Sequence, residues 1–333
     1  MSSNKNRLLR YDKAINEALY QKMAQDKSVF VLGQGVKSPW YVGATTKGLY
    51  NKFGSARVID TPVSENAVTG VAAGAAMTGM RPVVIHPRMD FMVYATDQIT
   101  NEIANWNYMF GGKASPVPIV IRPIINRGGE QGAQHAQALQ AWFAHLPGLK
   151  VVMPATPYDA KGLLTSAIED NNPVMYIDDR WLYDLEENVP REIYRVPIGK
   201  GAVRMRGKDI TIVGISYMAA EAAIAAQELK KDRISAEVID VRSVKPLDIP
   251  LILKSVRKTK RLIIAEAAWL SGSVSAEIAA RVASDPQSFK ALKSPIKRVT
   301  LPDVPAPVSR TLEAAYYINA KDIVTAVKNI LKK

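Results

Sequence analysis

Short apolar runs alternate with segments of helical periodicity through the first half of the chain. The runs have the length of buried strands and fall at Val29–Leu32, Val58–Ile59, Pro82–Ile85, Pro118–Ile121, Val151–Met153 and Val174–Ile177. Between them, apolar residues at helical spacing predict helices over 7–25, 43–53, 95–109 and 158–169. Alternation of this kind is typical of stacked βα units, so it predicts a mainly parallel sheet.

The same alternation restarts in the second half. Strands are predicted at Ile210–Gly214, Ala236–Asp240 and Leu262–Ala265, with helices over 219–229, 249–255, 273–283 and 320–331. The polar, proline-containing stretch from 178 to 208 interrupts the pattern. We therefore expect an α/β protein with two parallel-sheet domains, the first over 1–190 and the second over 209–333, joined by a linker at 191–208.

One predicted helix differs from the others because it consists almost wholly of small residues. Glu65 follows Ser64 at its head, and Gly70 and Gly74 leave one side without bulk. We expect the Ser64 hydroxyl to cap the helix and the bare side to accept a closely packed backbone. Glu65 is either a positioned functional acid or a first-turn acid that complements the helix dipole. Spacing alone favours the second interpretation.

Composition places the chain among soluble globular proteins. The chain has 333 residues, of which 47% are hydrophobic and 23% charged, enough for two domains with sizeable cores. No apolar run reaches membrane-spanning length. The N-terminus has no apolar signal core, so we expect a cytoplasmic protein. The absence of cysteine excludes disulfides, a thiolate nucleophile and a cysteine zinc site.

The net charge of +13 suggests anionic partners, such as a phosphorylated cofactor or an acidic protein surface. The basic residues are spread along the chain without interleaved aromatic residues, so we expect no nucleic-acid binding. The three histidines, His86, His135 and His145, show no metal-ligand spacing. We interpret His86 and His145 as surface or packing residues.

Collinear motifs over nearly the whole chain resemble one family. They include DTPVSE (60–65), GAAMTGMRPV (74–83), TDQITN (96–101), PVPIVIR (116–122), QHAQ (134–137), AWFAHLPGLKVVMP (141–154) and PDVPAP (302–307). With these motifs the chain resembles the β-subunit of the thiamine-diphosphate-dependent decarboxylase component of 2-oxo acid dehydrogenases, the pyruvate dehydrogenase type. The resemblance implies a pyrimidine-binding thiamine domain followed by a transketolase-type C-terminal domain.

The resemblance also implies an activity and partners. Such an enzyme decarboxylates a 2-oxo acid, here expected to be pyruvate, and transfers the acyl group to a lipoyl acyltransferase. The family's GDG motif, which binds Mg²⁺ and diphosphate, is absent from this chain and lies on a separate α-subunit. The implied working unit is an α2β2 heterotetramer that shares thiamine diphosphate between chains.

Three positions acquire cofactor roles through the resemblance. The glutamate that matches Glu65 contacts a ring nitrogen of the aminopyrimidine, and a proton shared there favours the imino tautomer that activates the cofactor. Desolvation by bound cofactor would keep that proton on the carboxyl group, whereas the helix N-terminus would favour the anion. Phe91 matches the aromatic residue that packs on the aminopyrimidine. Tyr94 stands near the pyrimidine where many relatives carry glutamine.

Two further positions match active-site residues. His135 matches the histidine that holds the substrate or intermediate and guides lipoyl transfer. Asp97 matches an acid of the polar channel between the two active sites, although it could equally cap or pair near its helix start. Gln34 and Gly35 replace an acidic pair of that channel, so proton communication between sites is not implied.

A structural potassium site is implied at positions that ring the ion in several relatives. The matching residues are Ile119, Ala167, Ile168, Asp170 and Asn172. Backbone carbonyls with one carboxylate suit a large monovalent cation. The alternative is a helix C-terminus whose carbonyls are met by water.

Two other functions compete with this hypothesis. A split transketolase-like enzyme or non-oxidative carboligase would keep thiamine but have no lipoyl partner. HPRMDFMVY (86–94), INRGGEQ (125–131) and the basic end KNILKK favour it, because they depart from the family's usual sequence or oppose docking of a basic partner domain. A degenerate scaffold subunit is the other alternative, and the joint presence of Glu65, Phe91 and His135 argues against it.

Overall fold

The computed structural model describes residues 7–331 and divides them into two compact units. The first unit comprises the described residues up to Arg127 together with Trp142–Ile198. The second comprises Gly128–Ala141 and the described residues from Gly199 onward. The second unit thus takes in a segment from the middle of the chain, while the predicted domain borders stay predictions.

The first unit is built on a parallel sheet with the strand order β6-β7-β5-β4-β2-β3. The strands are β2 (Val29–Gly33), β3 (Val58–Asp60), β4 (Arg81–His86), β5 (Val120–Ile125), β6 (Lys150–Val152) and β7 (Val174–Tyr176). A short strand β8 (Asp178–Asp179) continues beyond β7 and also pairs with β5 in parallel. β2 and β5 are buried along their whole length, as expected for a sheet covered on both faces.

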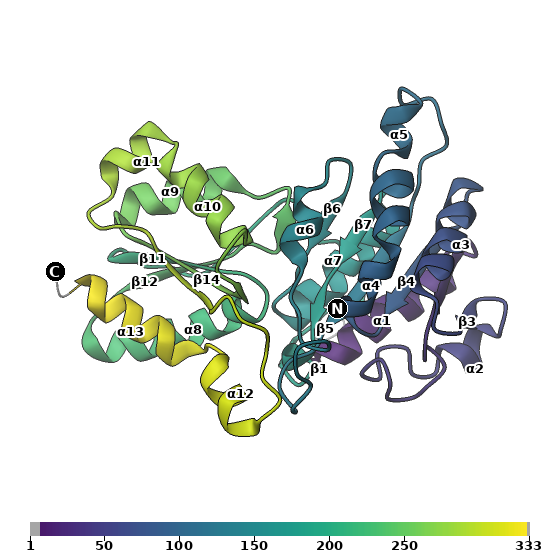
Figure 1. Ribbon diagram of the computed structural model, residues 1–333, viewed down its shortest axis with the longest axis horizontal. Coiled ribbons are helices and arrows are strands. Elements are labelled where there is room, and N and C mark those ends of the chain that lie inside the picture. The colour runs from purple at the N-terminus through teal and green to yellow at the C-terminus, as the bar shows by residue number, and fades with distance from the viewer. Residues whose placement is uncertain (1–6, 332–333) are drawn as a thin grey trace, which may run out of the picture. The chain divides into compact units, whose positions relative to one another are not determined.

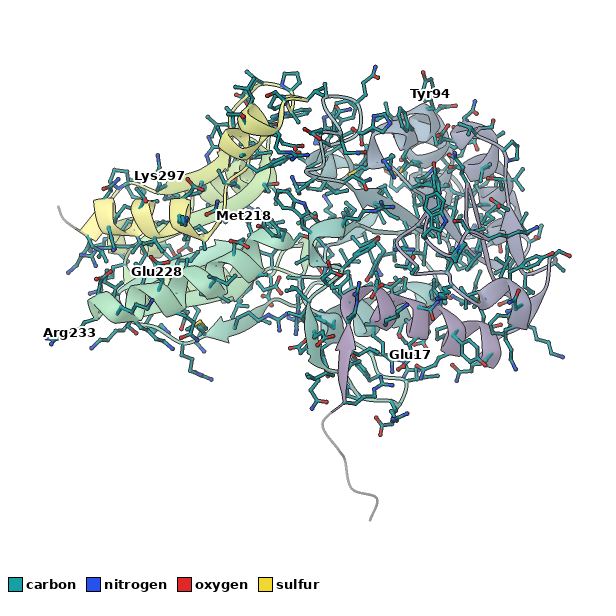
Figure 2. The ribbon with its side chains drawn as sticks, turned by 90° about the horizontal axis from the view of Figure 1, so that it is seen from below. Glu17, Tyr94, Met218, Glu228, Arg233 and Lys297 are labelled. Carbon is teal, nitrogen blue, oxygen red and sulfur yellow. The ribbon has the colours of Figure 1, made fainter. Side chains whose placement is uncertain are left out.

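Helices cover this sheet (Figure 1). They are α1 (Tyr11–Gln25), α2 (Leu49–Phe53), α3 (Glu65–Met77), α4 (Met89–Met92), α7 (Pro157–Glu169) and most of α6 (Gln140–His145). A further helix, α5 (Trp106–Met109), projects away from the sheet and has no buried residue. α1 packs on α7, and Figure 2 labels Glu17 on α1, which accepts a hydrogen bond from the fully buried Lys161 Nζ at 2.6 Å. An antiparallel pair of strands, β1 (Leu8–Arg10) and β9 (Glu186–Asn188), lies beside them.

Several predicted elements of the first unit have different bounds. The helix predicted from residue 7 begins at Tyr11, because Leu8–Arg10 is extended and pairs with β9. The helix predicted from 43 begins at Leu49, because Gly43 and Gly48 have positive φ angles of 66° and 80° that a helix cannot contain. At Gly43, a Cβ would lie 2.0 Å from the Tyr183 ring, so only glycine fits there.

The segment 95–109 is helical along almost all of its length, as predicted, but it is not one regular α-helix. The chain forms a 3₁₀ turn η1 (Val93–Ala95), a π-helical segment η2 (Gln98–Ala104) and then α5. The predicted stop at Gly111 and Gly112 is confirmed, since both have left-handed φ angles. Periodicity could not reveal the π-helical segment, because its wider turns shift the side-chain spacing only locally.

The second unit contains a sheet in the order β10-β12-β11-β14-β15. The strands are β10 (Ala202–Met205), β11 (Ile210–Gly214), β12 (Ala236–Asp240), β14 (Leu262–Trp269) and β15 (Lys297–Leu301). All neighbours are parallel except β10, which pairs antiparallel with β12 at the edge. β10 lies within the predicted linker, and its half-exposed positions explain why no apolar run marks it. The predicted α/β class with parallel sheets is confirmed in both units.

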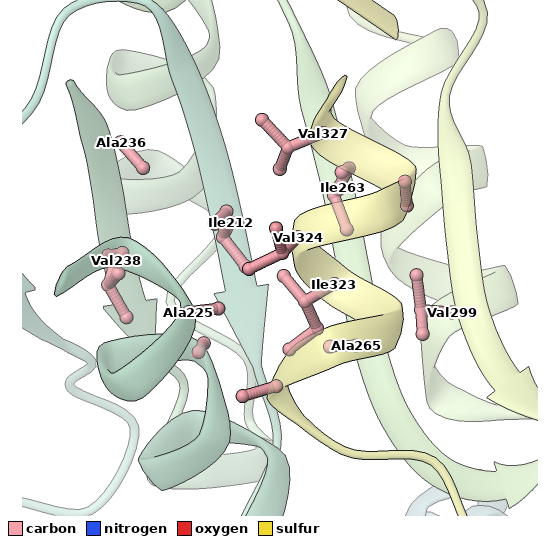
Figure 3. Close-up of a cluster of buried hydrophobic side chains, with 14 of the residues drawn as sticks. Ile212, Ala225, Ala236, Val238, Ile263, Ala265, Val299, Ile323, Val324 and Val327 are labelled. Atoms are coloured by element: carbon pink, nitrogen blue, oxygen red, sulfur yellow. The ribbon is translucent and has the colours of Figure 1, made fainter. Parts of the chain in front are cut away.

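Helices lie on both faces of the second sheet (Figure 1). They are α8 (Tyr217–Leu229), α9 (Ile249–Thr259), α10 (Val274–Ala283), α11 (Pro286–Ala291), α12 (Arg310–Tyr316) and α13 (Ala320–Leu331). The second unit also contains the 3₁₀ turn η4 (Lys230–Asp232) and the short strand β13 (Ser243–Lys245), and the first unit contains the 3₁₀ turn η3 (Arg180–Leu182). Figure 3 shows the core on the α8 and α13 side, where Ile212 and Ile263 meet Ala225 and Val324. No helix among residues 7–331 has the length and apolarity needed to cross a membrane.

Candidate active site

The carboxyl ends of three neighbouring parallel strands meet at one edge of the first sheet. β2 ends at Gly33 and lies between β3, which ends at Asp60, and β4, which ends at His86. A small cavity, open to solvent, lies there. Its lining residues are Gly33, Gln34, Thr61, Pro62, Val63, Ser64, Glu65, Val68, Ile85, His86 and Pro87. Open parallel sheets bind ligands at this edge.

Glu65 is half-buried in the cavity wall and is the first residue of α3. Ser64 occupies the N-cap position, but its side chain makes no cap hydrogen bond, so the predicted Ser64 cap is wrong. Its φ of −164° and ψ of 74° lie outside the usual N-cap region. The Ser64 hydroxyl instead donates to Asn66 Oδ1 at 3.3 Å. Glu65 therefore faces the cavity from the positive end of a helix.

The side of α3 that carries Gly74 is open in this chain, whereas Gly70, one turn earlier, lies against Gln98. The opposite side of the helix is buried through Thr69, Ala72, Ala73 and Ala76. On the open side, Val71 is 67% exposed, and a Cβ at Gly74 would have no atom within 4 Å. A helix whose small-residue face is bare leaves room for another chain at that face.

His86 lines the same cavity as Glu65, which sequence reasoning did not predict. The side chain is buried at the end of β4, and its Nε2 lies 3.2 Å from Thr69 Oγ1 on α3. Burial lowers the pKa of His86 from 6.5 to about 4, so the ring is neutral at pH 7. Its packing was predicted, but an isolated histidine gave no signal that it would share a wall with Glu65. His145 is exposed, as predicted.

The remaining predicted cofactor residues lie on the segment after β4. Phe91 in α4 is half-buried, and Tyr94 is 75% exposed and projects at the surface in Figure 2. Neither is among the residues that line the cavity with Glu65. Asp97 is exposed and accepts a hydrogen bond from Asn101 Nδ2 at 2.6 Å, which is the local pairing that the sequence left open. Its predicted channel role, like the roles of Phe91 and Tyr94, stays a prediction.

Comparison with known proteins identifies the family. Residues 8–184 match the family described as "Transketolase, pyrimidine binding domain", and residues 199–323 match "Transketolase, C-terminal domain". The acetoin:2,6-dichlorophenolindophenol oxidoreductase β-subunit of Cupriavidus necator is 44% identical over 96% of both chains. The mitochondrial pyruvate dehydrogenase E1 β-subunit of Dictyostelium discoideum is 41% identical over 96% of this chain and 90% of its own. The chain belongs to the transketolase-type family of pyruvate dehydrogenase E1 β-subunits.

A solved structure agrees with this E1 β-type assignment. A "split gene transketolase, inactive beta4 tetramer" superposes with a TM-score of 0.77 at 25% identity, covering 97% of this chain and 98% of its own. The resemblance carried by DTPVSE, QHAQ and PDVPAP is thereby confirmed, as is the α/β class of both domains.

His135 of this E1 β-type chain lies in the segment 128–141, which belongs to the second unit. The side chain is half-buried, and its backbone N–H donates to Gly132 O at 3.5 Å. Gly132 has a φ of +68°, and a Cβ there would lie 2.7 Å from Val308. The backbone N–H of Glu130 donates to Glu313 Oε2 of α12 at 3.0 Å. The loop that carries His135 is thus fastened within the second unit.

The predicted potassium ligands gather around the C-terminus of α7. The Arg81 guanidinium donates to the carbonyls of Ile168 and Asp170 at 3.0 and 3.1 Å. Lys150 Nζ lies 2.5 Å from the Asp170 carboxylate, which also accepts from the Asn172 N–H at 2.9 Å. Burial would raise the pKa of Asp170, but these hydrogen bonds outweigh burial and lower it. Two of the carbonyls are therefore met by Arg81, which neither earlier interpretation included.

Ile119 and Ala167 complete that predicted set. The carbonyl of Ile119 accepts from the Val174 N–H at 3.0 Å, and Ala167 is buried on α7. Each carbonyl oxygen that accepts one hydrogen bond keeps a second lone pair. All of these ligand atoms are oxygens, which hard cations prefer. The positively charged side chains of Arg81 and Lys150 already bind some of them.

A buried ion pair supports the carboxyl edge of the sheet. Arg122 of β5 donates to both carboxylate oxygens of Asp178 in β8, at 3.0 and 2.7 Å, and to Thr45 Oγ1 at 2.8 Å. Tyr183 also donates to Asp178. Burial would lower the pKa of Arg122, but the charge and hydrogen bonds of Asp178, together with Tyr183 and Tyr176, outweigh burial and raise it. No local pattern predicts this network, because the partners lie far apart in sequence.

Proposed function

We propose that this chain is the β-subunit of a thiamine-diphosphate-dependent 2-oxo acid dehydrogenase that acts on pyruvate. The observation that carries the proposal is Glu65, an acid in the wall of a cavity at the carboxyl ends of β2, β3 and β4. Relatives named pyruvate dehydrogenase E1 β-subunits match nearly the full chain at 41–43% identity. With a lipoyl acyltransferase, the acyl group would pass to a lipoyl group.

The residues that line this cavity have the chemistry to bind the aminopyrimidine part of thiamine diphosphate. It offers one carboxyl group, the neutral His86 ring and the apolar side chains of Val68 and Ile85. Bound thiamine diphosphate supplies the carbanion chemistry that removes CO₂ from a 2-oxo acid. Glu65 would hold a proton between its carboxyl oxygen and the ring nitrogen. His86 and Thr69 would keep that wall of the cavity rigid through their hydrogen bond.

An α-subunit would complete the site and hold Mg²⁺ with the diphosphate. The open Gly74 side of α3 lies on the same helix as Glu65, so a partner packed there would adjoin the cavity. Large apolar side chains are also exposed near the π-helical segment: Tyr94, Tyr108, Met109, Phe110. Exposed apolar patches of this kind mark protein interfaces. We propose an α2β2 assembly in the cytoplasm, with K⁺ at the α7 terminus.

Activity of the assembled enzyme tests the proposal. The chain is co-expressed with an α-subunit, and decarboxylation of pyruvate is measured for the wild type and for Glu65→Gln. We expect the variant to lose about 10²–10⁴-fold in kcat, the range for removal of a general acid–base group. Glu102→Gln is the matched control, because Glu102 is exposed on η2 and away from the cavity lining. Full activity of Glu65→Gln would refute the proposal.

A non-oxidative thiamine-dependent carboligase is the second candidate. His86 and Pro87, the first residues of the unusual segment HPRMDFMVY, line the cavity itself, so the departure from the family sequence affects the site directly. Binding to a lipoyl acyltransferase separates the two candidates. Tight binding in a pull-down with purified acyltransferase would favour the dehydrogenase, and carboligation without any such binding would favour the carboligase.

A further inference from the structure

Three arginines follow three neighbouring strands at the carboxyl edge of the first sheet. Arg88 comes just after β4, Arg127 just after β5 and Arg180 directly after β8. β5 pairs with both β4 and β8, with His86 opposite Pro123 and Ile125 opposite Asp179. The topology therefore brings three guanidinium groups to the edge where the Glu65 cavity opens.

Arg88 and Arg180 have few hydrogen-bond acceptors. Arg88 Nη1 donates to the carbonyl of Pro87 at 2.9 Å, and Arg180 Nη2 donates to the carbonyl of Tyr41 at 2.6 Å. The Nε atoms of both are buried and have no partner within residues 7–331. A guanidinium cannot lose its proton to relieve this arrangement, so its donors remain available.

The nearby carboxylates do not neutralise these two arginines. Asp178 is bound to Arg122, and Asp179 accepts from Arg127 Nε at 2.7 Å. Burial lowers the pKa of Arg88, and repulsion from the charge of Arg180 lowers it further, more than the attraction of Asp90 raises it. The two acids of β8 are therefore bound to Arg122 and Arg127, and Arg88 and Arg180 repel each other.

Arg127 adds a third donor to this edge. Its side chain is only 3% exposed and is anchored by Asp179, yet its Nη1 is buried and has no partner among the described residues. Unsatisfied buried donors are rare in native proteins, because a charged group that loses its contact with water and gains no partner destabilises the fold. Three of them on adjacent strands indicate that a ligand completes the arrangement.

Hydrogen bonds link Arg88 to the cavity lining directly and Arg180 to it through Tyr41. Pro87, which lines the cavity, accepts from both Arg88 and Asn126, the latter at 3.1 Å. Gln34, also in the cavity lining, donates to the Tyr41 hydroxyl at 3.1 Å, while the Tyr41 carbonyl accepts from Arg180. A ligand bound at the arginines would therefore lie beside the wall that contains Glu65.

We propose that Arg88, Arg127 and Arg180 form a binding site for an anionic oxygen group, a carboxylate or a phosphate, at one end of the substrate. Guanidinium groups match such anions because they offer parallel N–H donors to two oxygens. The inference rests on the proposed function for the identity of the ligand as substrate, and it deepens that function. The site would take either the carboxylate of pyruvate itself or a further anionic group beyond the reacting carbonyl, and the probes distinguish the two.

Thermal unfolding of the full chain tests the site without cofactor or α-subunit. The probes are inorganic phosphate, the dicarboxylate 2-oxoglutarate and the monocarboxylate pyruvate, each against NaCl of equal ionic strength. We expect phosphate or 2-oxoglutarate to raise Tm, and Arg88→Gln and Arg180→Gln to weaken the apparent affinity at least about tenfold, which is 1.4 kcal/mol. A larger shift with phosphate identifies a phosphorylated substrate, and a larger shift with 2-oxoglutarate identifies a second carboxylate.

Controls separate this site from general charge effects and from the proposed catalysis. Arg281→Gln removes the same charge from the exposed surface of α10, 59% accessible, and should keep the full shift. Glu65→Gln should keep it too, although that variant loses activity. Without anion, Arg88→Gln should be at least as stable as wild type, because it removes a repelling charge. A lower Tm for that variant, an absent anion shift in wild type, or a full shift in both arginine variants would overturn the site.

Discussion

The two sheets of the protein have the same parallel construction but differ at their carboxyl edges. In the second sheet, Asp240 at the end of β12 is paired with Arg204 at 2.7 Å. Glu266 of β14 accepts from Gln140 Nε2 at 2.8 Å and from the Ser275 N–H at 2.6 Å. In the first sheet, the donors of Arg88 and Arg180 remain open beside the cavity. Sheet topology alone therefore does not make a site, since polar groups must also be left without internal partners.

Both kinds of polar group occur within the first sheet itself. Arg122 is fully buried and its ion pair with Asp178 is complete, whereas the buried Nε atoms of Arg88 and Arg180 on the same edge have no hydrogen-bond partner among the described residues. The complete pair supports the fold, and the incomplete group is available to a ligand. Substitutions in the two groups should therefore have opposite consequences for stability, which the following predictions examine.

The largest effect is expected at the complete pair. Arg122→Met should lower the free energy of unfolding by about 3–5 kcal/mol, because Asp178 would remain buried and unpaired. Chemical denaturation measures this loss. The double variant Arg122→Met/Asp178→Leu should recover most of it, and Arg195→Met, at an exposed pair with Glu169, should change stability little. A mild effect of Arg122→Met alone would show that the pair does not support this edge.

Because its ring is buried in the neutral form, His86 should make the free energy of unfolding depend on pH below 6.5. Its pKa is about 4 when folded and 6.5 when unfolded, so protons bind the unfolded state preferentially between these values. Stability is full above pH 6.5 and should fall by about 3 kcal/mol as pH drops toward 4. His86→Gln, which keeps a hydrogen-bonding group for Thr69, should flatten this dependence. An unchanged pH profile would contradict the burial of a neutral ring.

Glu266 in the second sheet should give a dependence of the opposite sign. Burial raises its pKa above the ordinary 4.5, with smaller opposing effects from Ser275 and Gln140. The folded state then binds the proton more tightly than the unfolded state, so stability declines as pH rises above 4.5. Glu266→Gln should remove this decline in denaturation curves measured from pH 4.5 to 7. A steeper decline in the variant would show that the carboxylate is stabilised instead.

The smallest effect is expected at the predicted potassium site. Replacing K⁺ by Na⁺ at equal ionic strength should lower the free energy of unfolding by about 1 kcal/mol, as for a ligand present at a few times its Kd. Asp170→Asn should abolish the difference between the two salts. Identical melting curves in K⁺ and Na⁺ would indicate that Arg81 and Lys150 satisfy these oxygens without an ion.

Periodicity predicted the strands of both sheets closely, because a buried parallel strand is a short apolar run whose ends are marked by polar residues. It placed β11 and β12 with the bounds that the structure shows. It missed β10 and β15, whose half-exposed residues form no such run. The helix over 43–53 was too long because the pattern does not reveal that Gly43 must approach the Tyr183 ring.

The site was less predictable than the fold. Glu65 and its position at a helix start followed from the chain itself, and the resemblance supplied its role. The sharing of one cavity wall by Glu65 and His86 depends on the pairing of β2, β3 and β4, which are separated by long stretches of sequence. The three arginines likewise appear unrelated until the strands that precede them are placed side by side.

The grouping of segment 128–141 with the second unit limits how the protein can be divided. The backbone N–H of Glu130 donates to the Glu313 carboxylate, and the Gln140 side chain donates to Glu266. In each bond the donor precedes the predicted linker in the sequence and the acceptor follows it. After a protease cuts between 191 and 208, the N-terminal fragment should stay bound to the C-terminal fragment, because residues 128–141 pack within the second unit. The two fragments of the cleaved chain should therefore elute together in gel filtration. The two halves, expressed as separate chains, should fold only when they are co-expressed.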